Sequence, residues 1–171
     1  MPRVLETAEN GDDVAVSVED ILDTYSPRTK DMVIKYPQIM EARSGGKRLV
    51  ALEKEFDVSS STIGYYATRS MCPKVYTMLE SCRWLPLKKS DDLDFLVGYV
   101  HDHGYIPKSM RTAKVWNADM FELQRIKKRM QIVFKRNFRI TKDRRIYVIN
   151  TDSLTARALH LAGVPVGKKV K

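Results

Sequence analysis

The sequence predicts an α+β protein with a helical module in its first half and an αββαββα domain in its second half. Three observations lead to this prediction. Apolar residues recur at helical spacing on both sides of a short break near residue 57. From residue 90 onward, helix-spaced segments alternate with pairs of short segments in which apolar and polar residues alternate. Acidic residues gather at the N-terminus and basic residues in the C-terminal half.

The composition is that of a soluble globular protein. The chain has 171 residues, of which 43% are hydrophobic and 30% charged, and this length suits one domain or two small ones. No apolar run approaches the roughly 18 residues that span a bilayer, and the N-terminus has no secretory signal pattern, so we expect no membrane partner and a cytoplasmic location. The cysteines Cys72 and Cys82 are too few for a disulfide scaffold, and no cluster has zinc-ligand spacing.

The charge is unevenly distributed along the chain. Residues 1–24 hold seven acidic residues and one arginine, and we expect residues 1–25 to form a flexible, solvated acidic arm. Residues 104–171 hold seventeen Lys and Arg against four Asp and Glu. So basic a segment favours a polyanionic partner, because phosphates that bind cations release counterions. Nucleic acid is the predicted partner; the alternative is a basic surface that serves only solubility.

Residues 26–86 are predicted to form a helical module. Ser26 and Pro27 fit the N-cap and the first position of a helix, and Pro37 is expected to limit the length of that helix. The end of the module, residues 84–90, is predicted to be a linker.

A helix-turn-helix unit is the predicted centre of this module. Helical spacing covers residues 47–56 and 60–69, and the apolar residues at the expected crossing are Leu52, Phe56, Val58, Ile63 and Tyr66. The candidate DNA contacts of the second helix are Ser60, Ser61, Thr62, Tyr65 and Arg69. Two positions depart from the usual pattern, since Glu53 stands where a small residue is normal and Asp57 replaces the turn glycine. A helical hairpin without a DNA role is the alternative.

The second domain is predicted to span residues 90–171. Ser90 can cap its first helix, and Gly104 follows that helix. The expected elements are a helix over 93–103, two short strands within 105–117, a helix over 119–136, a hairpin over 138–150 and a helix over 154–162.

One segment of this domain resembles a known family. Residues 95–106 read FLVGYVHDHGYI, which is similar to the LAGLIDADG motif of homing endonucleases. The αββαββα order is the order of elements in that family, and residues 162–169 (AGVPVGKK) look like the ending that many members share. The resemblance covers residues 90–171, about half of the chain.

The resemblance implies a homodimer on double-stranded DNA with a roughly palindromic site. The motif helices of two copies would pack together through Leu96, Val97, Gly98 and Val100, and the strands would form a saddle in the major groove. The implied DNA contacts are Lys108, Arg111, Lys114, Arg139, Thr141, Lys142, Arg144, Arg145, Tyr147, Lys168 and Lys169. In this arrangement Arg139, Thr141, Arg145 and Tyr147 form the outward face of the hairpin, whereas Ile140, Ile146 and Val148 pack onto the helices.

The sequence departs from the family at the residue that decides the chemistry. Family nucleases bind their catalytic metal through the last acidic residue of the motif, and His103 stands at that position. His101 replaces the earlier acidic residue, and Asp102 is turned about 100° away on the helix. Imidazole is a poor substitute for the oxygen ligands that Mg²⁺ prefers. We therefore expect no catalytic residues, no metal and no cofactor; Mg²⁺ enters only if the protein is a nuclease.

These observations predict a sequence-specific DNA-binding protein, a transcriptional repressor derived from a homing endonuclease that has lost catalysis. The resemblance suggests a phage or mobile-element origin and a place on the nucleoid of a bacterial or phage-infected cell. One alternative is an active metal-dependent endonuclease or nickase that uses Asp102. A second is an RNA-binding, maturase-like protein, and a third is a basic protein without sequence preference.

Overall fold

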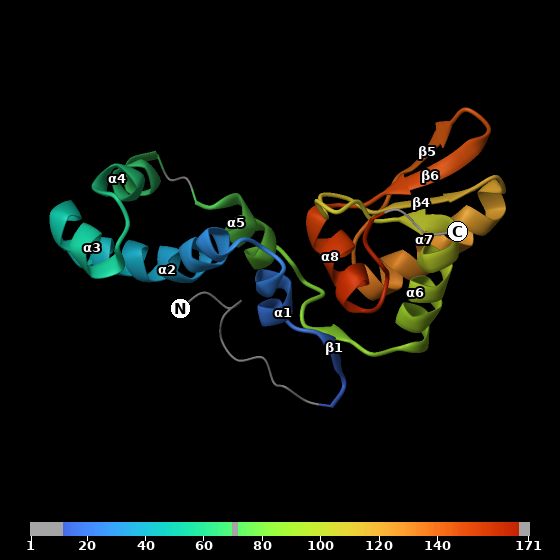
Figure 1. Cartoon of the computed structure of the whole chain (residues 1–171), viewed down its shortest axis with the longest axis horizontal. Helices are drawn as coiled ribbons and strands as arrows, with labels where there is room; N and C mark the ends of the chain where they lie inside the picture. Colours follow the sequence, from blue (N-terminus) through green and yellow to red (C-terminus); the bar gives the residue numbers. More distant parts are fainter. Residues whose placement is uncertain (1–11, 70–71, 168–171) are drawn as a thin grey trace. The chain divides into compact units, whose positions relative to one another are not determined.

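The structure is a computed structural model that describes residues 12–69 and 72–167. Within these residues the chain is α+β, with eight helices and two small antiparallel sheets (Figure 1). It divides into two compact units: unit 1 comprises residues 25–82, and the rest of the described chain forms unit 2. Unit 1 is thus inserted into unit 2 between Thr24 and Arg83. None of the described helices is both long and apolar enough to cross a bilayer.

The described part of unit 1 consists of four helices. Their bounds are Pro27–Ser44 (α2), Leu49–Phe56 (α3), Ser60–Arg69 (α4) and Lys74–Glu80 (α5). The helices α2, α3 and α4 share one small core, whose buried members are Ile39, Leu52, Val58 and Ile63. Each helix contributes too few apolar residues to be stable alone, so the three helices stabilise one another.

The connection between α3 and α4 is a tight turn. Asp57 adopts the left-handed conformation, with φ 53° and ψ 47°, which Asp tolerates better than most residues. Val58 is buried beneath the turn. The Ser59 hydroxyl caps α4, because it accepts a hydrogen bond from the Thr62 amide at 3.4 Å. The structure therefore confirms the two predicted helices and the turn between them.

Pro37 lies inside α2, so the prediction that it limits this helix was wrong. A proline in a helix interior removes one hydrogen-bond donor and costs about 3 kcal/mol. The helix continues because Val33 and Ile39, on either side of the proline, are 1% and 0% exposed. Burial of the two side chains outweighs the lost backbone hydrogen bond.

Unit 2 has the predicted αββαββα order from residue 91 onward. Its elements are Asp91–His103 (α6), Gly104–Tyr105 (β3), Lys114–Asn117 (β4), Met120–Phe134 (α7), Ile140–Asp143 (β5), Ile146–Asn150 (β6) and Ser153–Leu161 (α8). The four strands form an antiparallel sheet in the order β3-β4-β6-β5. The first pair of strands is short, and a long loop joins β3 to β4.

The strand register defines two faces of this sheet. Val115 lies opposite Ile149, which lies opposite Ile140, and residues paired across antiparallel strands project to the same side. Val115 and Ile149 are 0% exposed, since α6 and α7 pack on this face. The other face carries Trp116 and Thr141, which lie on either side of Val148. Lys114, Thr141 and Asn150 on this second face are exposed, so the face is open to solvent at these positions, whereas Val148 is 7% exposed.

Residues 12–24 are not the solvated arm that we expected. Strand β1 (Val14–Val16) pairs antiparallel with β2 (Leu87–Lys88), and α1 (Val18–Asp23) packs against α8. The acidic residues of α1, Glu19, Asp20 and Asp23, are exposed. Ile21 and Leu22 of the same helix are buried, together with Val16 at the end of β1. The part of the expected arm before residue 12 lies outside the described residues.

The expected linker over residues 84–90 is also part of unit 2. Trp84 and Leu87 are 6% and 3% exposed. The indole of Trp84 meets the ring of Phe134 edge to face, with the ring centroids 5.1 Å apart. The two units therefore divide after residue 82 rather than at the predicted residue 86.

Arg157 fixes the end of α1 within unit 2. Its Nη1 donates to the backbone carbonyl oxygen and to the hydroxyl of Thr24, both at 2.6 Å, and the residue is 7% exposed. We predict that Arg157→Ala lowers the free energy of unfolding by about 1–3 kcal/mol, because the half-buried carbonyl and hydroxyl of Thr24 lose a charged donor. Urea denaturation followed by circular dichroism measures the change against Lys88→Ala, an exposed control. An unfolding midpoint equal to that of the control would contradict this role.

Candidate nucleic-acid interface

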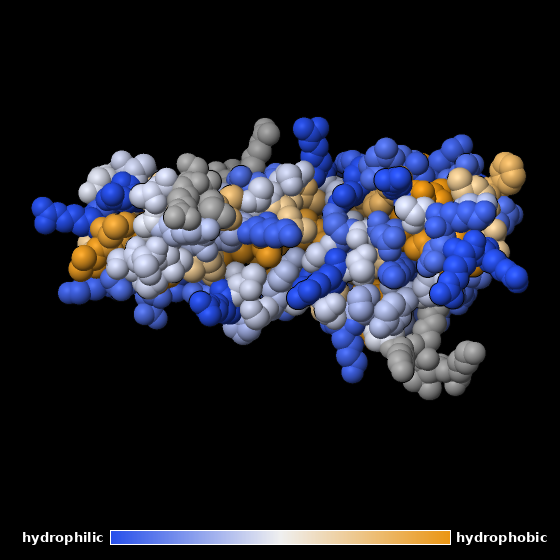
Figure 2. Space-filling view, turned by 90° about the horizontal axis from the view of Figure 1, so that it is seen from above, coloured by the Kyte–Doolittle hydropathy of each residue, from blue (hydrophilic) through white to orange (hydrophobic). Residues whose placement is uncertain are grey.

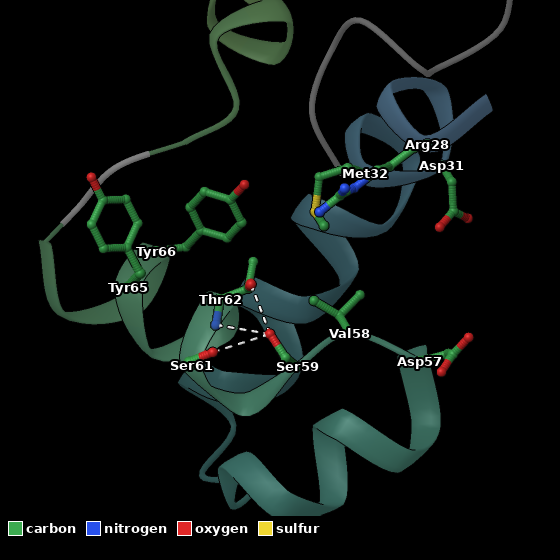
Figure 3. A pocket seen from close by; sticks show the side chains of 10 residues that line it. All are labelled: Arg28, Asp31, Met32, Asp57, Val58, Ser59, Ser61, Thr62, Tyr65 and Tyr66. Atoms are coloured by element: carbon green, nitrogen blue, oxygen red, sulfur yellow. Dashed lines mark hydrogen bonds between the residues drawn. The ribbon is translucent and has the colours of Figure 1, made fainter. Parts of the chain in front are cut away.

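Unit 1 has an open pocket between the start of α2, the α3–α4 turn and α4 (Figure 3). Its volume is about 720 Å³. The lining combines positively and negatively charged side chains, hydroxyl groups and two tyrosine rings. Its residues are Arg28, Asp31, Met32, Asp57, Val58, Ser59, Ser61, Thr62, Tyr65 and Tyr66. Residues more than 25 positions apart meet here because α2 crosses the helix-turn-helix unit. Sequence analysis missed Arg28 and Asp31, since no local pattern connects them to α4.

The predicted hydroxyl residues do gather at the front of α4. The Ser59 hydroxyl lies 3.2 Å from the Ser61 hydroxyl and 2.8 Å from the Thr62 hydroxyl (Figure 3). Ser61 is exposed, whereas Ser60 and Thr62 are half-buried. Hydroxyl groups both donate and accept hydrogen bonds, so this group can bind either a phosphate oxygen or a base edge.

The outer face of α4 carries Ser61, Tyr65 and Thr68. These residues are spaced by four and three positions, which places them on one side of the helix, and Tyr65 is 41% exposed. The Thr68 hydroxyl donates to the carbonyl oxygen of Gly64 at 2.6 Å. Arg69, the fifth predicted contact, belongs to α4, but its side chain lies outside what the structure describes. The face is neutral and can make hydrogen bonds, as a helix in the major groove requires.

A tyrosine cluster holds α4 and α5 against α2. The ring of Tyr36 lies 5.5 Å from that of Tyr66 and 4.9 Å from that of Tyr76, centroid to centroid. Burial raises the pKa of Tyr36 and of Tyr76, and in Tyr76 the nearby Glu80 raises the pKa further. The Tyr76 hydroxyl donates to the Glu80 carboxylate at 2.9 Å. The cluster fixes the position of the exposed face of α4.

In unit 2, exposed cations gather on the β5–β6 hairpin. The predicted contacts Arg139, Lys142, Arg144 and Arg145 are all exposed, and Arg144 adopts a left-handed conformation in the turn, with φ 54°. A shallow hollow at the tip is lined by Asp143, Arg144, Arg145 and Ile146. Seen from the side to which this hairpin projects, hydrophilic side chains dominate the surface of unit 2 (Figure 2).

The structure corrects the faces predicted for this hairpin. Tyr147 pairs with Lys142 and shares the helix-facing side with Ile149, so it does not lie beside Thr141 as expected. The Lys142 ammonium lies 5.9 Å from the centre of the Tyr147 ring. Conversely, Ile146 and Val148 lie on the open face rather than against the helices. In β6 two apolar residues, Val148 and Ile149, are adjacent, and it is Ile149 that faces the core.

The predicted contacts of the first pair of strands are exposed as well. Lys108 and Arg111 lie in the β3–β4 loop, and Lys114 begins β4 on the open face of the sheet. Lys168 and Lys169 lie outside the described residues. Sequence analysis missed Trp116, although its alternation with Val115 places it on the same face as Lys114.

Only part of the partner surface that we expected on helix α6 is exposed. Leu96 and Val100 are 0% exposed, since they pack in the core of unit 2, so they cannot form a dimer interface. Val97 is half-buried. Gly98 is exposed, and nothing lies within 4 Å of the position that a Cβ atom would occupy there. Phe95, on the same side of the helix, is 42% exposed.

The end of the motif helix carries two exposed histidines. The Nδ1 atom of His101 lies 3.1 Å from an oxygen of Asp102, and both side chains are largely exposed. The His103 ring lies 4.9 Å from the ring of Tyr99, centroid to centroid. Burial raises the pKa of Tyr99, whose hydroxyl accepts a hydrogen bond from Asn117 at 2.7 Å. Among the described residues, no group of three or more His, Cys, Asp and Glu could hold a metal ion.

Comparisons with protein-family models, with curated proteins and with solved structures found no match to this chain.

The raised pKa of Tyr76 predicts a pH dependence of stability. An unfolded tyrosine ionises near pH 10, whereas the folded state keeps Tyr76 protonated to higher pH. Its contribution to stability is therefore complete below about pH 10 and is lost as the pH rises toward the folded pKa. We expect the urea midpoint to fall between about pH 9 and about pH 11, and to fall less in Tyr76→Phe. Equal slopes in both proteins would contradict this.

Proposed function

We propose that the chain binds duplex DNA at a specific sequence. The observation that carries the proposal is the helix-turn-helix core of unit 1, which presents the neutral, hydrogen-bonding face of α4 on a rigid three-helix support. Such a helix fits the major groove, where each base pair shows a distinct pattern of donors and acceptors. Ser61, Tyr65 and Thr68 are the residues that read base edges.

The cations of unit 2 supply the second part of the proposal. Arg139, Lys142, Arg144 and Arg145 are exposed on one projecting hairpin, where they can bind phosphates or base edges. Phosphate contacts give affinity and position, whereas base contacts give specificity. The hairpin adds binding energy to the contacts of α4 and lengthens the recognised site.

The proposed form on DNA is a homodimer that does not cut. Gly98 in the middle of the exposed side of α6 costs about 0.5–1 kcal/mol relative to alanine, and no contact within the chain requires it. Close packing against the α6 helix of a second copy of the chain would explain why a glycine stands at this position. His103 replaces the metal-binding carboxylate that the resemblance to homing endonucleases leads one to expect. A bound dimer without cleavage blocks a promoter and so acts as a repressor.

Selection of bound duplexes from a random DNA pool, in the presence of Mg²⁺, tests the proposal. We expect enrichment of one nearly palindromic sequence that is recovered uncut. Enrichment with cutting would show an active nuclease in place of a repressor. Absence of any enriched sequence, with binding that depends only on salt, would overturn sequence-specific recognition.

Tyr65→Ala is predicted to weaken binding to the selected duplex by about 1–3 kcal/mol, or about tenfold to a hundredfold, because one base contact is lost. Tyr65 is exposed, so the fold remains intact. Fluorescence anisotropy of a labelled duplex measures the change. The matched control is Gln38→Ala, a neutral exposed residue on α2. An affinity equal to that of the control would exclude Tyr65 from the interface.

Gly98→Leu is predicted to lower the dimer fraction, because the side chain separates the two α6 helices. Gly98→Ala is the matched variant, with a much smaller side chain. Both should fold, since the position is open. Sedimentation equilibrium over a range of protein concentrations measures the dimer fraction. Dimerisation unchanged in Gly98→Leu would show that α6 is not the interface.

A further inference from the structure

The open face of the four-stranded sheet carries two aromatic side chains among polar ones. In one row across the strands, Tyr105 lies opposite Lys114, which lies opposite Asn150. In the next row, Trp116 and Thr141 flank Val148. Proposed DNA binding through α4 and the hairpin does not use the aromatic part of this face.

The register fixes the spacing within this surface, which we call the aromatic platform (Tyr105, Lys114, Trp116, Thr141 and Asn150). Opposite residues of antiparallel strands have Cβ atoms about 5 Å apart, and the two rows are about 7 Å apart along β4. The indole of Trp116 therefore has a cation two positions before it and a hydroxyl on the far side of Val148.

Exposure within the platform matches a surface that receives a flat ring. Lys114, Thr141 and Asn150 are exposed, whereas Tyr105 and Trp116 are half-buried. Val148, between the indole and the threonine, is only 7% exposed. Part of the Trp116 side chain is therefore accessible to a ligand.

The surrounding charge favours an anion. Lys108 and Arg111 are exposed in the loop that leads into β4, and Arg139 is exposed just before β5. Asp143 is an acidic residue on the open face, and it lies at the last position of β5, beside the hairpin turn. Aromatic rings beside cations attract a ligand that has both a flat ring and a phosphate.

We propose that the aromatic platform binds single-stranded DNA, with one unpaired base stacked on Trp116. Lys114 binds the adjoining phosphate, while Thr141 and Asn150 form hydrogen bonds to the base. The choice of DNA over RNA rests on the proposed function, because α4 already brings the chain to DNA.

An intact duplex does not fit this surface. Each base in a duplex is covered on both sides by its neighbours, so no base face is available to an aromatic ring unless the base is unstacked. Four-stranded sheets with exposed aromatic residues bind nucleic acid in this way, by stacking single-stranded bases. An acidic peptide would satisfy the cations but would leave both aromatic rings without a partner.

Tryptophan fluorescence tests the proposal on the full chain. The sequence has two tryptophans, and Trp84 is only 6% exposed beside Phe134, so an added ligand reaches Trp116. Titration with a ten-nucleotide oligothymidylate should quench the emission in a saturable, salt-dependent manner, and Trp84→Phe should keep the quenching. A complete absence of quenching would overturn the proposal.

Variants separate the platform from the duplex site. Trp116→Ala is expected to weaken binding of labelled oligothymidylate about tenfold, measured by anisotropy, while binding of the selected duplex through α4 stays within twofold. Lys114→Gln, at an exposed position, is expected to weaken binding of oligothymidylate by about threefold. It should also reduce the slope of log affinity against log salt concentration by about one. Retained duplex binding shows that Trp116→Ala is folded, and an unchanged far-UV circular dichroism spectrum shows the same for Lys114→Gln. Equal oligothymidylate affinity in all three proteins would contradict the platform.

The outcomes for the two sites are distinguishable. If oligouridylate reached half-maximal quenching at a tenfold lower concentration than oligothymidylate, the assignment to DNA would be overturned in favour of RNA. Duplex selection without oligothymidylate binding would reject the platform and leave the proposed function intact. Oligothymidylate binding without any selected duplex would support the platform and reject sequence-specific duplex recognition.

Discussion

The pairing of β4 with β6 and of β6 with β5 determines which side chains unit 2 offers to a partner. Because side chains alternate along a strand, a shift of one residue would exchange the two faces of the sheet. The observed register buries Val115 and Ile149 against α6 and α7 and leaves Trp116 and Thr141 on the open side. The cations of the hairpin and the aromatic platform both depend on this register.

The insertion of unit 1 into unit 2 gives the second constraint. Residues 12–24 are part of unit 2 because β1 pairs with β2 and Arg157 binds Thr24. Trp84 is buried in unit 2 directly after the chain leaves unit 1. The helix-turn-helix unit is therefore attached at both of its ends, and each end begins at a residue fixed in the other unit.

Much of the fold could be predicted from the sequence where the pattern is local. The spacing of Leu52 and Ile63 around Asp57 indicated the helix-turn-helix unit, and the alternation of periods indicated the αββαββα order. Long-range packing determines the features of the fold that local patterns do not indicate. Burial of Ile21 in unit 2 could not be predicted from an acidic segment, and Leu96 in the motif helix serves the chain's own core. The exposed cations of the hairpin were named from the family resemblance, whereas the pocket residue Arg28 is brought to α4 only by the fold.

Hydrogen exchange of the full chain, with and without a saturating selected duplex, tests whether α4 and the β5–β6 hairpin bind DNA. The account predicts slower exchange in α4 and in the β5–β6 hairpin, because both contact the DNA, and little change along α7 on the helix-covered side of the sheet. Protection along α7 with none in α4 or the hairpin would contradict the account. That result would place the DNA on the opposite side of unit 2 and would remove the reading role from unit 1.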